Sequence, residues 1–400
     1  DGIDLRIRHA QLGGYRRVLV GRHRGRIADQ PRVLPLRRCV AQQFDRLVTD
    51  TGLRYSVPAT NDSQVTGGEK VEGQQNTNTA QVRLGYGKIK PVLDQVFEFD
   101  ETYYAKDAWS ILNHGVELTL ANNANSIIQA GHTNIFAPCS GTSACGEYVV
   151  QPEVGKLLIA VGEWLFGLNP FGWRFASAVF GSLAILLICR IARRMTRSTL
   201  LGCVAGLLMS LDGLEFVLSR TGILDIFLMF FVLAAFGCIL IDRDAGRAQL
   251  ADGVARRQGG QLGPRFGIRR WRVAAGICLG LAVATKWNAA WYIIGFAALI
   301  TAWDIGARRA AGLKSFVRGG LREARWLPVT FIAIPLGVYL ASWSGWFATS
   351  TGYDRDYAQA HGVHTPVISA LYSLFEYHRE AIGFGLGLSL PHPYQSQPWD

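Results

Sequence analysis

The first 150 residues contain no long apolar run, although the 400-residue chain as a whole is 49% hydrophobic. The sequence also lacks a Walker A phosphate loop, a dinucleotide-binding glycine fingerprint and a triad of metal ligands. Its seven cysteines match no zinc or haem spacing. These absences argue against a soluble nucleotide-dependent enzyme and against a metalloenzyme, so we expect neither a cofactor nor a metal site.

Lysine is scarce: the chain has 41 basic residues, of which seven are lysines and 34 are arginines, and its net charge is +11. Arginines between apolar segments are typical of cytoplasmic loops in membrane proteins, so this charge does not require nucleic acid, and we expect no such partner. Residues 1–48 carry eleven arginines and lack the apolar core of a signal peptide. We interpret residues 1–96 as an atypical arginine-rich and polar leader that is disordered.

Apolar residues are concentrated beyond residue 172, in runs long enough, or nearly so, to cross a bilayer, which takes roughly 20 residues. A soluble domain of this size would not need so many such runs. The sequence therefore predicts an all-α polytopic membrane protein with a helix bundle over residues 173–345. The six expected spans are Trp173–Cys189, Leu200–Leu218, Ile223–Ile241, Val273–Thr285, Trp287–Ala302 and Leu327–Trp343.

Charges in the connecting loops give these spans an orientation. Residues 190–197 contain four arginines, residues 242–272 contain eight arginines and three aspartates, and residues 308–325 contain six basic residues and one acid. Positively charged loops stay on the cytoplasmic side, so the remaining loops face outward. The prediction is a multi-pass protein of the plasma membrane, with residues 97–172 and 346–400 outside the cytoplasm.

Two shorter amphipathic segments lie in these outward-facing parts. Val154–Leu168 is apolar but contains Lys156 and Glu163, which is typical of an interfacial helix, with Trp164 at the level of the lipid headgroups. Thr365–Glu376 is a second segment of this kind. The first outward-facing part also needs a preceding transmembrane helix to carry it across, so we expect that such a helix is missing from the chain.

Most of the unusual ionisable residues fall on the outward side of this topology, which predicts an active site at the outer ends of the helices. The segment FEFDETYYAKDAW contains two adjacent carboxylates, Asp100 and Glu101. A carboxylate partly shielded by the neighbouring aromatic rings suits a general base that takes a proton from a hydroxyl. The alternative is a solvated acidic turn that caps a helix beginning near Thr102.

Four further residues are candidates for substrate binding, and each has a structural alternative. Arg174 could clamp a phosphate or carboxylate, or extend to lipid headgroups. Arg220 and Asp225 flank the turn SRTGILD and could instead pair with each other. Lys286 lies between two spans and could meet either the phosphate of a lipid-linked substrate or an ordinary headgroup.

Cys139 and Cys145 bracket the polar segment CSGTSAC in the first outward-facing part. The oxidising exterior of the cell permits a disulfide that closes this small loop, and two free thiols are the alternative. No soluble domain for a nucleotide sugar accompanies the helix bundle. A membrane enzyme without one would take its activated donor from the lipid.

Six motifs in order resemble landmarks of the actinobacterial-type protein O-mannosyltransferases, which are similar to the dolichyl-phosphate-mannose–protein mannosyltransferases. They are FDETYYAKDAWSILNHGVE, PEVGKLLIAVGEWLFGLNPFGWRF, LDGLEFVLSRTGILD, ATKWNAAW, WSGWFATSTGYDRDYA and HPYQSQPW. The resemblance runs from residue 97 to residue 400 and does not cover residues 1–96.

The resemblance implies a GT-C membrane glycosyltransferase fold that is incomplete at both ends, because the first helix is missing and relatives continue past Asp400. It implies transfer of mannose, with inversion, from polyprenyl-phosphate-mannose to Ser or Thr hydroxyls of secreted or membrane proteins at the extracytoplasmic face. The expected partners are this donor, the acceptor proteins, membrane lipid and the secretion translocon.

By likeness to the family, Asp100 is the base and Glu101 is its essential neighbour. Arg174 matches the arginine of the family's WRF motif, with Arg220 and Lys286 as companions on the phosphate. These cationic side chains would stabilise the leaving group without a metal. The remaining expected substrate contacts are Asp225, Tyr353, Asp354 and His392.

This sequence departs from the family at Gln151-Pro152-Glu153, where His-Pro-Pro is usual, which puts the positioning of donor or acceptor in question. Other functions stay open at this point. One is a GT-C enzyme that moves another lipid-linked sugar to a lipid or glycan acceptor. The others are a polytopic transporter, a non-catalytic scaffold and an inactive fragment of the enzyme.

Overall fold

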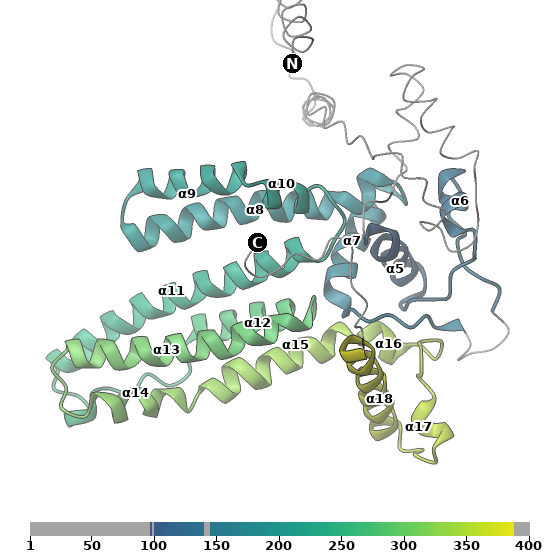
Figure 1. Ribbon diagram of the computed structural model, residues 1–400. Coiled ribbons are helices and arrows are strands. Elements are labelled where there is room, and N and C mark those ends of the chain that lie inside the picture. Colours follow the sequence, from purple (N-terminus) through teal and green to yellow (C-terminus); the bar gives the residue numbers. More distant parts are fainter. Residues whose placement is uncertain (1–96, 98–99, 140–144, 388–400) are drawn as a thin grey trace, which may run out of the picture. The chain divides into compact units, whose positions relative to one another are not determined.

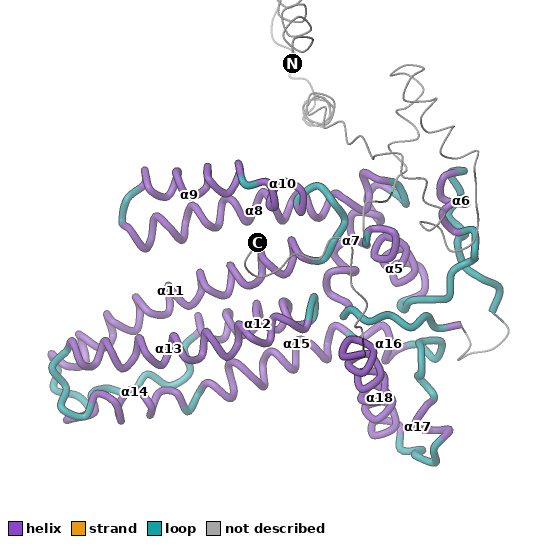
Figure 2. The backbone as a smooth tube through the Cα atoms, in the orientation of Figure 1, coloured by secondary structure: helices purple, strands orange, loops and turns teal. Residues whose placement is uncertain are grey.

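The computed structural model describes residues 97, 100–139 and 145–387. These residues belong to the second of two compact units, which begins at Asn78. The expected leader over residues 1–96 lies outside the described residues, and so does His392. Figure 2 shows that the described chain is helical apart from its connections. The predicted all-α class is confirmed for this part of the chain.

Four helical segments are long and apolar enough to cross a membrane. Three of them match predicted spans closely, and the last begins with an amphipathic stretch that the prediction placed in a cytoplasmic loop. They are α8 (Pro170–Thr196), α11 (Asp225–Ala255), the 3-10 turn η3 (Trp287–Ala289) continued by α13 (Ala290–Ala310), and α14 (Phe316–Ala324) continued through the π-helical η4 (Pro328–Ala333) into α15 (Ile334–Ser342).

The other two predicted spans are shorter helices. The expected span Leu200–Leu218 divides at Asp212 into α9 (Thr199–Leu211) and α10 (Gly213–Leu218). The Asp212 carboxylate accepts the backbone N–H of Glu215 at 2.9 Å and so caps the new helix. The remaining span is α12 (Arg270–Val283), which is 14 residues long and packs against α11 and α15.

Local sequence explains where α8 begins and how it packs. Pro170 occupies its first turn, and the Asn169 side chain accepts the backbone N–H groups of Phe171 and Gly172 at 3.1 and 3.0 Å. Gly172 faces Gly162 of α7 (Glu153–Phe166), where an added Cβ on Gly162 would lie 2.2 Å from the Gly172 carbonyl oxygen. Two glycines thus allow the backbones of α7 and α8 to touch.

The remaining helices lie at one end of the long ones in Figure 1. They are α5 (Glu101–His114), α6 (Ala124–Gln129), α7, α16 (Ser344–Ala348), α17 (Tyr357–Ala360) and α18 (Pro366–Gly387). The three arginine-rich connections lie at the opposite end of the long helices. The bundle therefore has the two-ended arrangement that the charge pattern predicted.

Two short helices with apolar faces match the predicted amphipathic segments. α7 coincides with the expected segment to within two residues, and its Trp164 is 70% exposed. α18 is longer than the predicted Thr365–Glu376, because the helix continues through Tyr377 to Gly387. In the described residues on either side of α6, antiparallel bridges pair Leu118 with Gly146 and Leu120 with Phe136.

Candidate functional site

The two adjacent acids at the start of α5 point in different directions. Asp100 is exposed, whereas the Glu101 side chain is fully buried. Both neighbours belong to the same turn, so the first residues of the helix place one carboxylate in solvent and the other inside the protein. The two acids are adjacent in the sequence, but their side chains lie in different environments in the structure.

Glu101 ties three segments of the chain together. Its Oε1 accepts the Nε–H of Arg174 at 2.7 Å, and its Oε2 accepts an Nη2–H of the same guanidinium at 2.6 Å. Oε1 also accepts the backbone N–H of Gly222 at 2.5 Å. A bidentate arginine–carboxylate pair is among the strongest polar contacts in proteins. Through this pair, α5 is fixed to the outer end of α8 and to the turn between α10 and α11.

Asp100 occupies the N-cap position of α5, but its side chain makes no capping hydrogen bond. Only its backbone carbonyl contributes there, by accepting the N–H groups of Tyr103 and Tyr104 at 2.9 and 3.1 Å. The capping alternative from the sequence is therefore not realised. The predicted shielding is also wrong in part, because the neighbouring Tyr103 ring is 62% exposed.

Arg220 does not pair with Asp225, contrary to the structural alternative considered from the sequence. Its guanidinium lies over the Phe216 ring, 4.5 Å from the centroid. Burial, together with the positive charge of Arg174, lowers the pKa of Arg220. Two guanidinium groups therefore lie near each other, and that of Arg174 is already paired with Glu101.

Asp225 forms its ion pair with Lys286 instead. The ammonium group lies 2.8 Å from each carboxylate oxygen, so the first residue of α11 is joined to the turn before α13. The buried Tyr104 connects this pair to the start of α5. Burial and the negative charges of Asp100 and Asp225 raise the pKa of the Tyr104 hydroxyl, so both carboxylates lie near this hydroxyl.

A pocket of about 410 Å³ opens beside Lys286. Its walls are the turn Lys286–Asn288, residues 150 and 151, and the last turns of α18, including Ala381 and Gly385. The backbone N–H of Val154 donates to the carbonyl of Ala284 at 2.9 Å, which fixes the start of α7 against this turn. The pocket is mostly apolar, with an ammonium group in its wall.

The departure from the family motif places an acid in a buried ionic cluster. Lys156 of α7 contacts Glu117 and lies 3.5 Å from Glu153. Asp107 is buried nearby, and burial raises its pKa to about 8 even though Lys156 acts in the opposite direction. Burial and the neighbouring Glu117 also raise the pKa of Glu153. Sequence reasoning missed this cluster, although a lysine inside an apolar helix was its signal.

A second group missed by sequence reasoning surrounds His378 of α18. Trp287 donates its Nε1–H to the Tyr339 hydroxyl at 3.0 Å, and that hydroxyl lies 2.5 Å from His378 Nε2. The His378 ring also stacks on Trp287, with 5.6 Å between centroids. Burial lowers the pKa of His378. No motif in the sequence marks this histidine.

Tyr353 and Asp354 lie in a different environment from the residues around Glu101. The Tyr353 hydroxyl donates to the carboxylate of Glu380 at 3.3 Å, and its ring packs against Tyr148 with 5.2 Å between centroids. Burial, Glu380 and two other acids raise the pKa of Asp354. Both residues are thus positioned against α18. Their predicted role in substrate binding stays a prediction, as does that of His392.

Cys139 and Cys145 form a disulfide. The bond joins two extended segments of the chain. Both segments form backbone hydrogen bonds with the stretch that contains residues 117 and 119. Of the two alternatives drawn from the sequence, the disulfide is the one the structure has. It fixes the part of the first outer region that follows α6.

The sites fall into a clear chemical arrangement. The exposed Asp100 carboxylate lies at the start of α5. The next residue, Glu101, holds Arg174, and Arg220 lies close by. Lys286 is paired with Asp225 and lines an apolar pocket. One exposed carboxylate and three cationic side chains are therefore found at the end of the bundle that carries α5, α7 and α18. Within the described residues, no group of His, Cys, Asp and Glu side chains is arranged to hold a metal ion.

The sequence of this chain is similar to those of known proteins. Over residues 146–348, just over half of the chain, the sequence matches the family model described as dolichyl-phosphate-mannose-protein mannosyltransferase. A polyprenol-phosphate-mannose–protein mannosyltransferase of Mycobacterium tuberculosis is 41% identical over 313 residues, covering 75% of this chain and 55% of that protein. A protein of the same name from Corynebacterium glutamicum is 34% identical over 319 residues, covering 75% of this chain and 57% of that protein.

Among solved structures, the protein O-mannosyltransferase Pmt1-Pmt2 complex of S. cerevisiae bound to the sugar donor matches with a TM-score of 0.43 and 18% identity. That match covers 65% of this chain and 31% of the yeast chain. The chain spans slightly more than half the length of the curated relatives it matches. The family match covers Arg174, Arg220, Asp225 and Lys286. The chain therefore belongs to the dolichyl-phosphate-mannose-protein mannosyltransferase family.

Proposed function

We propose that this protein transfers mannose from a polyprenyl-phosphate-mannose donor to Ser or Thr hydroxyls of secreted or membrane proteins. The observation that carries the proposal is the exposed Asp100 carboxylate next to the buried Glu101–Arg174 pair. In this proposal the carboxylate is the proton acceptor and the guanidinium binds the phosphate, which are the two groups that this reaction needs. The 41% identity to a polyprenol-phosphate-mannose–protein mannosyltransferase supports the same donor and acceptor.

In the proposed reaction, Asp100 takes the proton of the acceptor hydroxyl. The hydroxyl oxygen attacks the anomeric carbon of mannose from the side opposite the phosphate, so the configuration inverts. The new carbon–oxygen bond forms as the bond between the anomeric carbon and the phosphate oxygen breaks. The bonding electron pair leaves with the polyprenyl phosphate, and the proton ends on Asp100.

The phosphate leaving group needs stabilising positive charge more than it needs a proton. Arg174 supplies it in this proposal, with Arg220 as its neighbour. Glu101 is then a positioning residue, because it uses Nε and Nη2 of Arg174 and so fixes the plane of the guanidinium. Lys286 is the third candidate, oriented by Asp225 on the other side of Tyr104.

The pocket beside Lys286 suits the first part of the lipid chain. Its walls are mainly apolar, and Lys286, whose ammonium group is paired with Asp225, is the basic residue among them. Gln151 belongs to the lining, at the position where the family usually has histidine. We propose that this difference tunes how the donor is seated and leaves the chemistry unchanged.

The proposed location is the plasma membrane, with the site on the extracytoplasmic side. The arginine-rich connections at the other end of the bundle support this orientation, because such loops stay in the cytoplasm. In this orientation the acceptor segment would meet Asp100 as it leaves the secretion translocon. The proposed fold is of the GT-C type, which carries its active site at the outer ends of membrane helices.

The test uses membranes that contain the protein, a polyprenyl-phosphate-mannose donor with labelled sugar, and a peptide that contains Ser and Thr. We expect mannose on the peptide with wild type and a loss of at least about 100-fold with Asp100→Asn, the size of a general-base contribution. Asp252→Asn is the matched control, because Asp252 is also exposed but lies at the end of α11 among the arginine-rich connections.

Undiminished transfer by Asp100→Asn would show that Asp100 is not the base. Transfer of the sugar to a lipid or glycan, and none to the peptide, would point to another GT-C acceptor. Solute flux without consumption of the donor would favour a transporter.

A further inference from the structure

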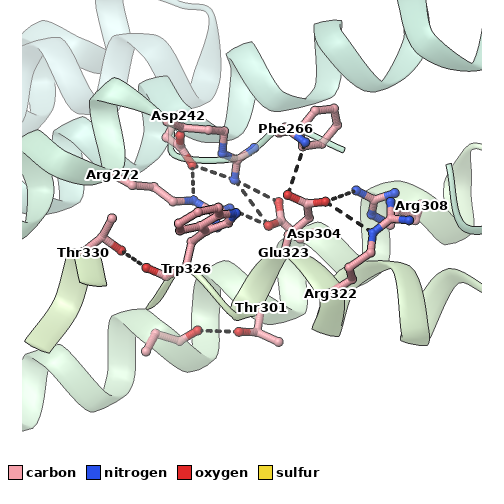
Figure 3. A network of polar contacts seen from close by, with 12 residues as sticks. Asp242, Phe266, Arg272, Thr301, Asp304, Arg308, Arg322, Glu323, Trp326 and Thr330 are labelled. Carbon is pink, nitrogen blue, oxygen red and sulfur yellow. Dashed lines mark hydrogen bonds and ion pairs between the residues drawn. The ribbon is translucent and has the colours of Figure 1, made fainter. Parts of the chain in front are cut away.

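Two polar networks join helices at opposite ends of the bundle. Figure 3 shows the first, in which Arg272 of α12 bridges Asp242 of α11 and Asp304 of α13. The enclosed space beside it is only about 10 Å³, which leaves room for a single water molecule at most. That network therefore fixes helices and offers no binding site. The second network borders the pocket of about 410 Å³ beside Lys286.

The second network is a chain of three side chains from three elements. Trp287 follows Lys286 in the turn before α13, Tyr339 lies in α15, and His378 lies in α18. The Trp287 Nε1–H donates to the Tyr339 hydroxyl at 3.0 Å, and this hydroxyl lies 2.5 Å from His378 Nε2. The network thus links two walls of the pocket, because Trp287 and the last turns of α18 both line it.

The surrounding groups give each atom in this chain one role. An indole N–H can only donate, so the Tyr339 oxygen accepts from Trp287. His378 Nδ1 lies 2.6 Å from the Leu374 carbonyl, which can only accept, so Nδ1 carries the hydrogen of a neutral ring. Nε2 is then an acceptor, and the Tyr339 hydroxyl donates to it. The chain of hydrogen bonds is complete only while His378 is neutral.

The rings around His378 favour its neutral form. The imidazole stacks on Trp287 and packs against the buried Trp343, with 5.6 and 5.0 Å between centroids. The titratable side chains in contact with it are those of Tyr339 and, on its own helix, Tyr377. Burial lowers the pKa of His378 accordingly.

Charged side chains of the neighbouring elements act on other groups. Glu153 and Lys156 of α7 act with opposite signs on the Tyr339 hydroxyl. Lys286 is held in an ion pair of its own. Within the described residues, no charged side chain contributes to the pKa of His378. A proton on this ring would therefore have no carboxylate to balance it.

We propose that Tyr339 and His378 are positioning residues for the lipid part of the donor. They fix the Trp287 side chain in the wall of the pocket and hold α18 against it. The residues of α18 that line the pocket begin with Ala381 and Ile382, one turn beyond His378. These roles rest on the proposed function, in which the pocket takes the first part of the polyprenyl chain.

Directional hydrogen bonds fix what apolar packing alone leaves free. Stacking on a flat imidazole lets the indole slide or rotate in its plane, whereas a hydrogen bond to Nε1 fixes its orientation. The same Tyr339 hydroxyl serves both partners, so its loss would release Trp287 and α18 together. A displaced Trp287 or α18 would change the shape of the pocket and weaken its hold on a lipid chain.

The experiment measures binding of polyprenyl-phosphate-mannose to the purified protein in detergent, with no acceptor present. Tyr339→Phe keeps the ring, removes the shared hydroxyl and should weaken binding about fivefold, the size of one hydrogen bond. Tyr372→Phe is the matched control, because Tyr372 is an exposed tyrosine of α18 outside the pocket lining. It should bind the donor as the wild type does.

Two variants at His378 separate positioning from a general effect on structure. His378→Gln keeps an acceptor near the place of Nε2 and should retain binding, whereas His378→Phe keeps a flat ring without an acceptor and should lose as much as Tyr339→Phe. In the wild type, binding should weaken as the pH falls below about 6.5, because a protonated Nε2 donates where it has to accept. His378→Gln should show no such dependence, and the phosphodiester of the donor does not titrate in this range.

Gly385→Leu tests the pocket itself. Gly385 lines the pocket, and an added Cβ there would meet no atom within 4 Å, so a leucine fills the space without strain. Binding of the donor should weaken. Gly383→Leu is the control, since Gly383 has equally open space but lies outside the lining.

Each contrary result has a different meaning. Unchanged binding in Tyr339→Phe, or an equal loss in His378→Gln and His378→Phe without pH dependence, would overturn the positioning role. Unchanged binding in Gly385→Leu would remove the lipid from this pocket and overturn the roles of both residues. Because transfer is not measured, a wild type that binds the donor through Tyr339 but transfers no mannose would refute the proposed reaction alone.

Discussion

Substituting Glu101 by glutamine tests whether this residue positions Arg174. The change keeps the size of the side chain and removes its charge. In the wild type, two oxygens of Glu101 accept bonds from the Arg174 guanidinium and from the Gly222 backbone N–H. A glutamine has one oxygen and one NH₂ group. It can therefore accept only some of these hydrogen bonds, and its NH₂ group, which is a donor, would face the guanidinium, which is also a donor.

The expected cost follows from burial. The Glu101 side chain is fully buried and that of Arg174 is 26% exposed, so the pair lies largely out of water. Breaking a buried ion pair by removing one partner typically costs about 3–5 kcal/mol, because the other charge is left uncompensated. Partial exposure of Arg174 lets water compensate part of the loss. We therefore expect Glu101→Gln to lower the free energy of unfolding by about 3 kcal/mol.

The assay is the unfolding midpoint of the purified protein in detergent, combined with a double-mutant cycle. If the pair acts as a unit, Glu101→Gln with Arg174→Gln should cost less than the sum of the two single changes. Glu376→Gln is the control, because Glu376 also makes a bidentate contact, to an arginine, Arg379, that is 69% exposed. An exposed pair is worth only about 0–1 kcal/mol.

Comparison with Asp100 sharpens the test. Asp100→Asn should abolish transfer and leave the unfolding midpoint unchanged, since its side chain makes no capping bond. Glu101→Gln should lower both the rate of transfer and the unfolding midpoint. An unchanged midpoint for Glu101→Gln, or strict additivity with Arg174→Gln, would refute the positioning role and leave Glu101 as a group that acts on the substrate directly.

Three further predictions concern the scaffold around the site. Burial raises the folded-state pKa of Asp107 to about 8, so the free energy of unfolding should fall as pH rises from about 4 to 8, by at most about 1.4 kcal/mol per pH unit. Thermal unfolding at a series of pH values measures this dependence, and Asp107→Asn should flatten it. Replacing Cys139 and Cys145 by serine should lower stability by about 2 kcal/mol, as reduction of the wild type should too. Gly155→Ala should lower the unfolding midpoint, because the added Cβ would lie 2.5 Å from Leu224 Cδ2, whereas Gly295→Ala has open space and should be neutral.

The predictable part of the fold follows from strong, periodic signals. Long apolar runs and arginine-rich loops predicted the membrane helices and the two ends of the bundle. The interruption at Asp212 was also visible, because an acid in an apolar run is costly unless it caps a helix end. The boundaries of α12 and α18 were less predictable, since packing against neighbouring helices decides where a helix stops.

The partners of the ionisable residues could not be predicted from the sequence. Asp225 is five residues from Arg220 and 61 residues from Lys286, yet the structure pairs it with Lys286. Proximity along the chain favoured the wrong partner, because the Arg220 guanidinium lies over the Phe216 ring and Asp225 reaches the turn before α13. Glu117 and Lys156 likewise meet across 39 residues. Such pairs depend on how helices cross, which local sequence does not encode.

The Asp100–Glu101 pair shows why an adjacent motif can conceal two different roles. Consecutive residues on a helix point about 100° apart, so when one faces the bundle its neighbour faces away. The buried carboxylate accepts hydrogen bonds that hold it in place, which suits positioning of Arg174. The exposed carboxylate keeps its lone pairs for a substrate. The proposed positioning role requires burial and the proposed base requires access, and two adjacent acids in one helical turn can satisfy both conditions.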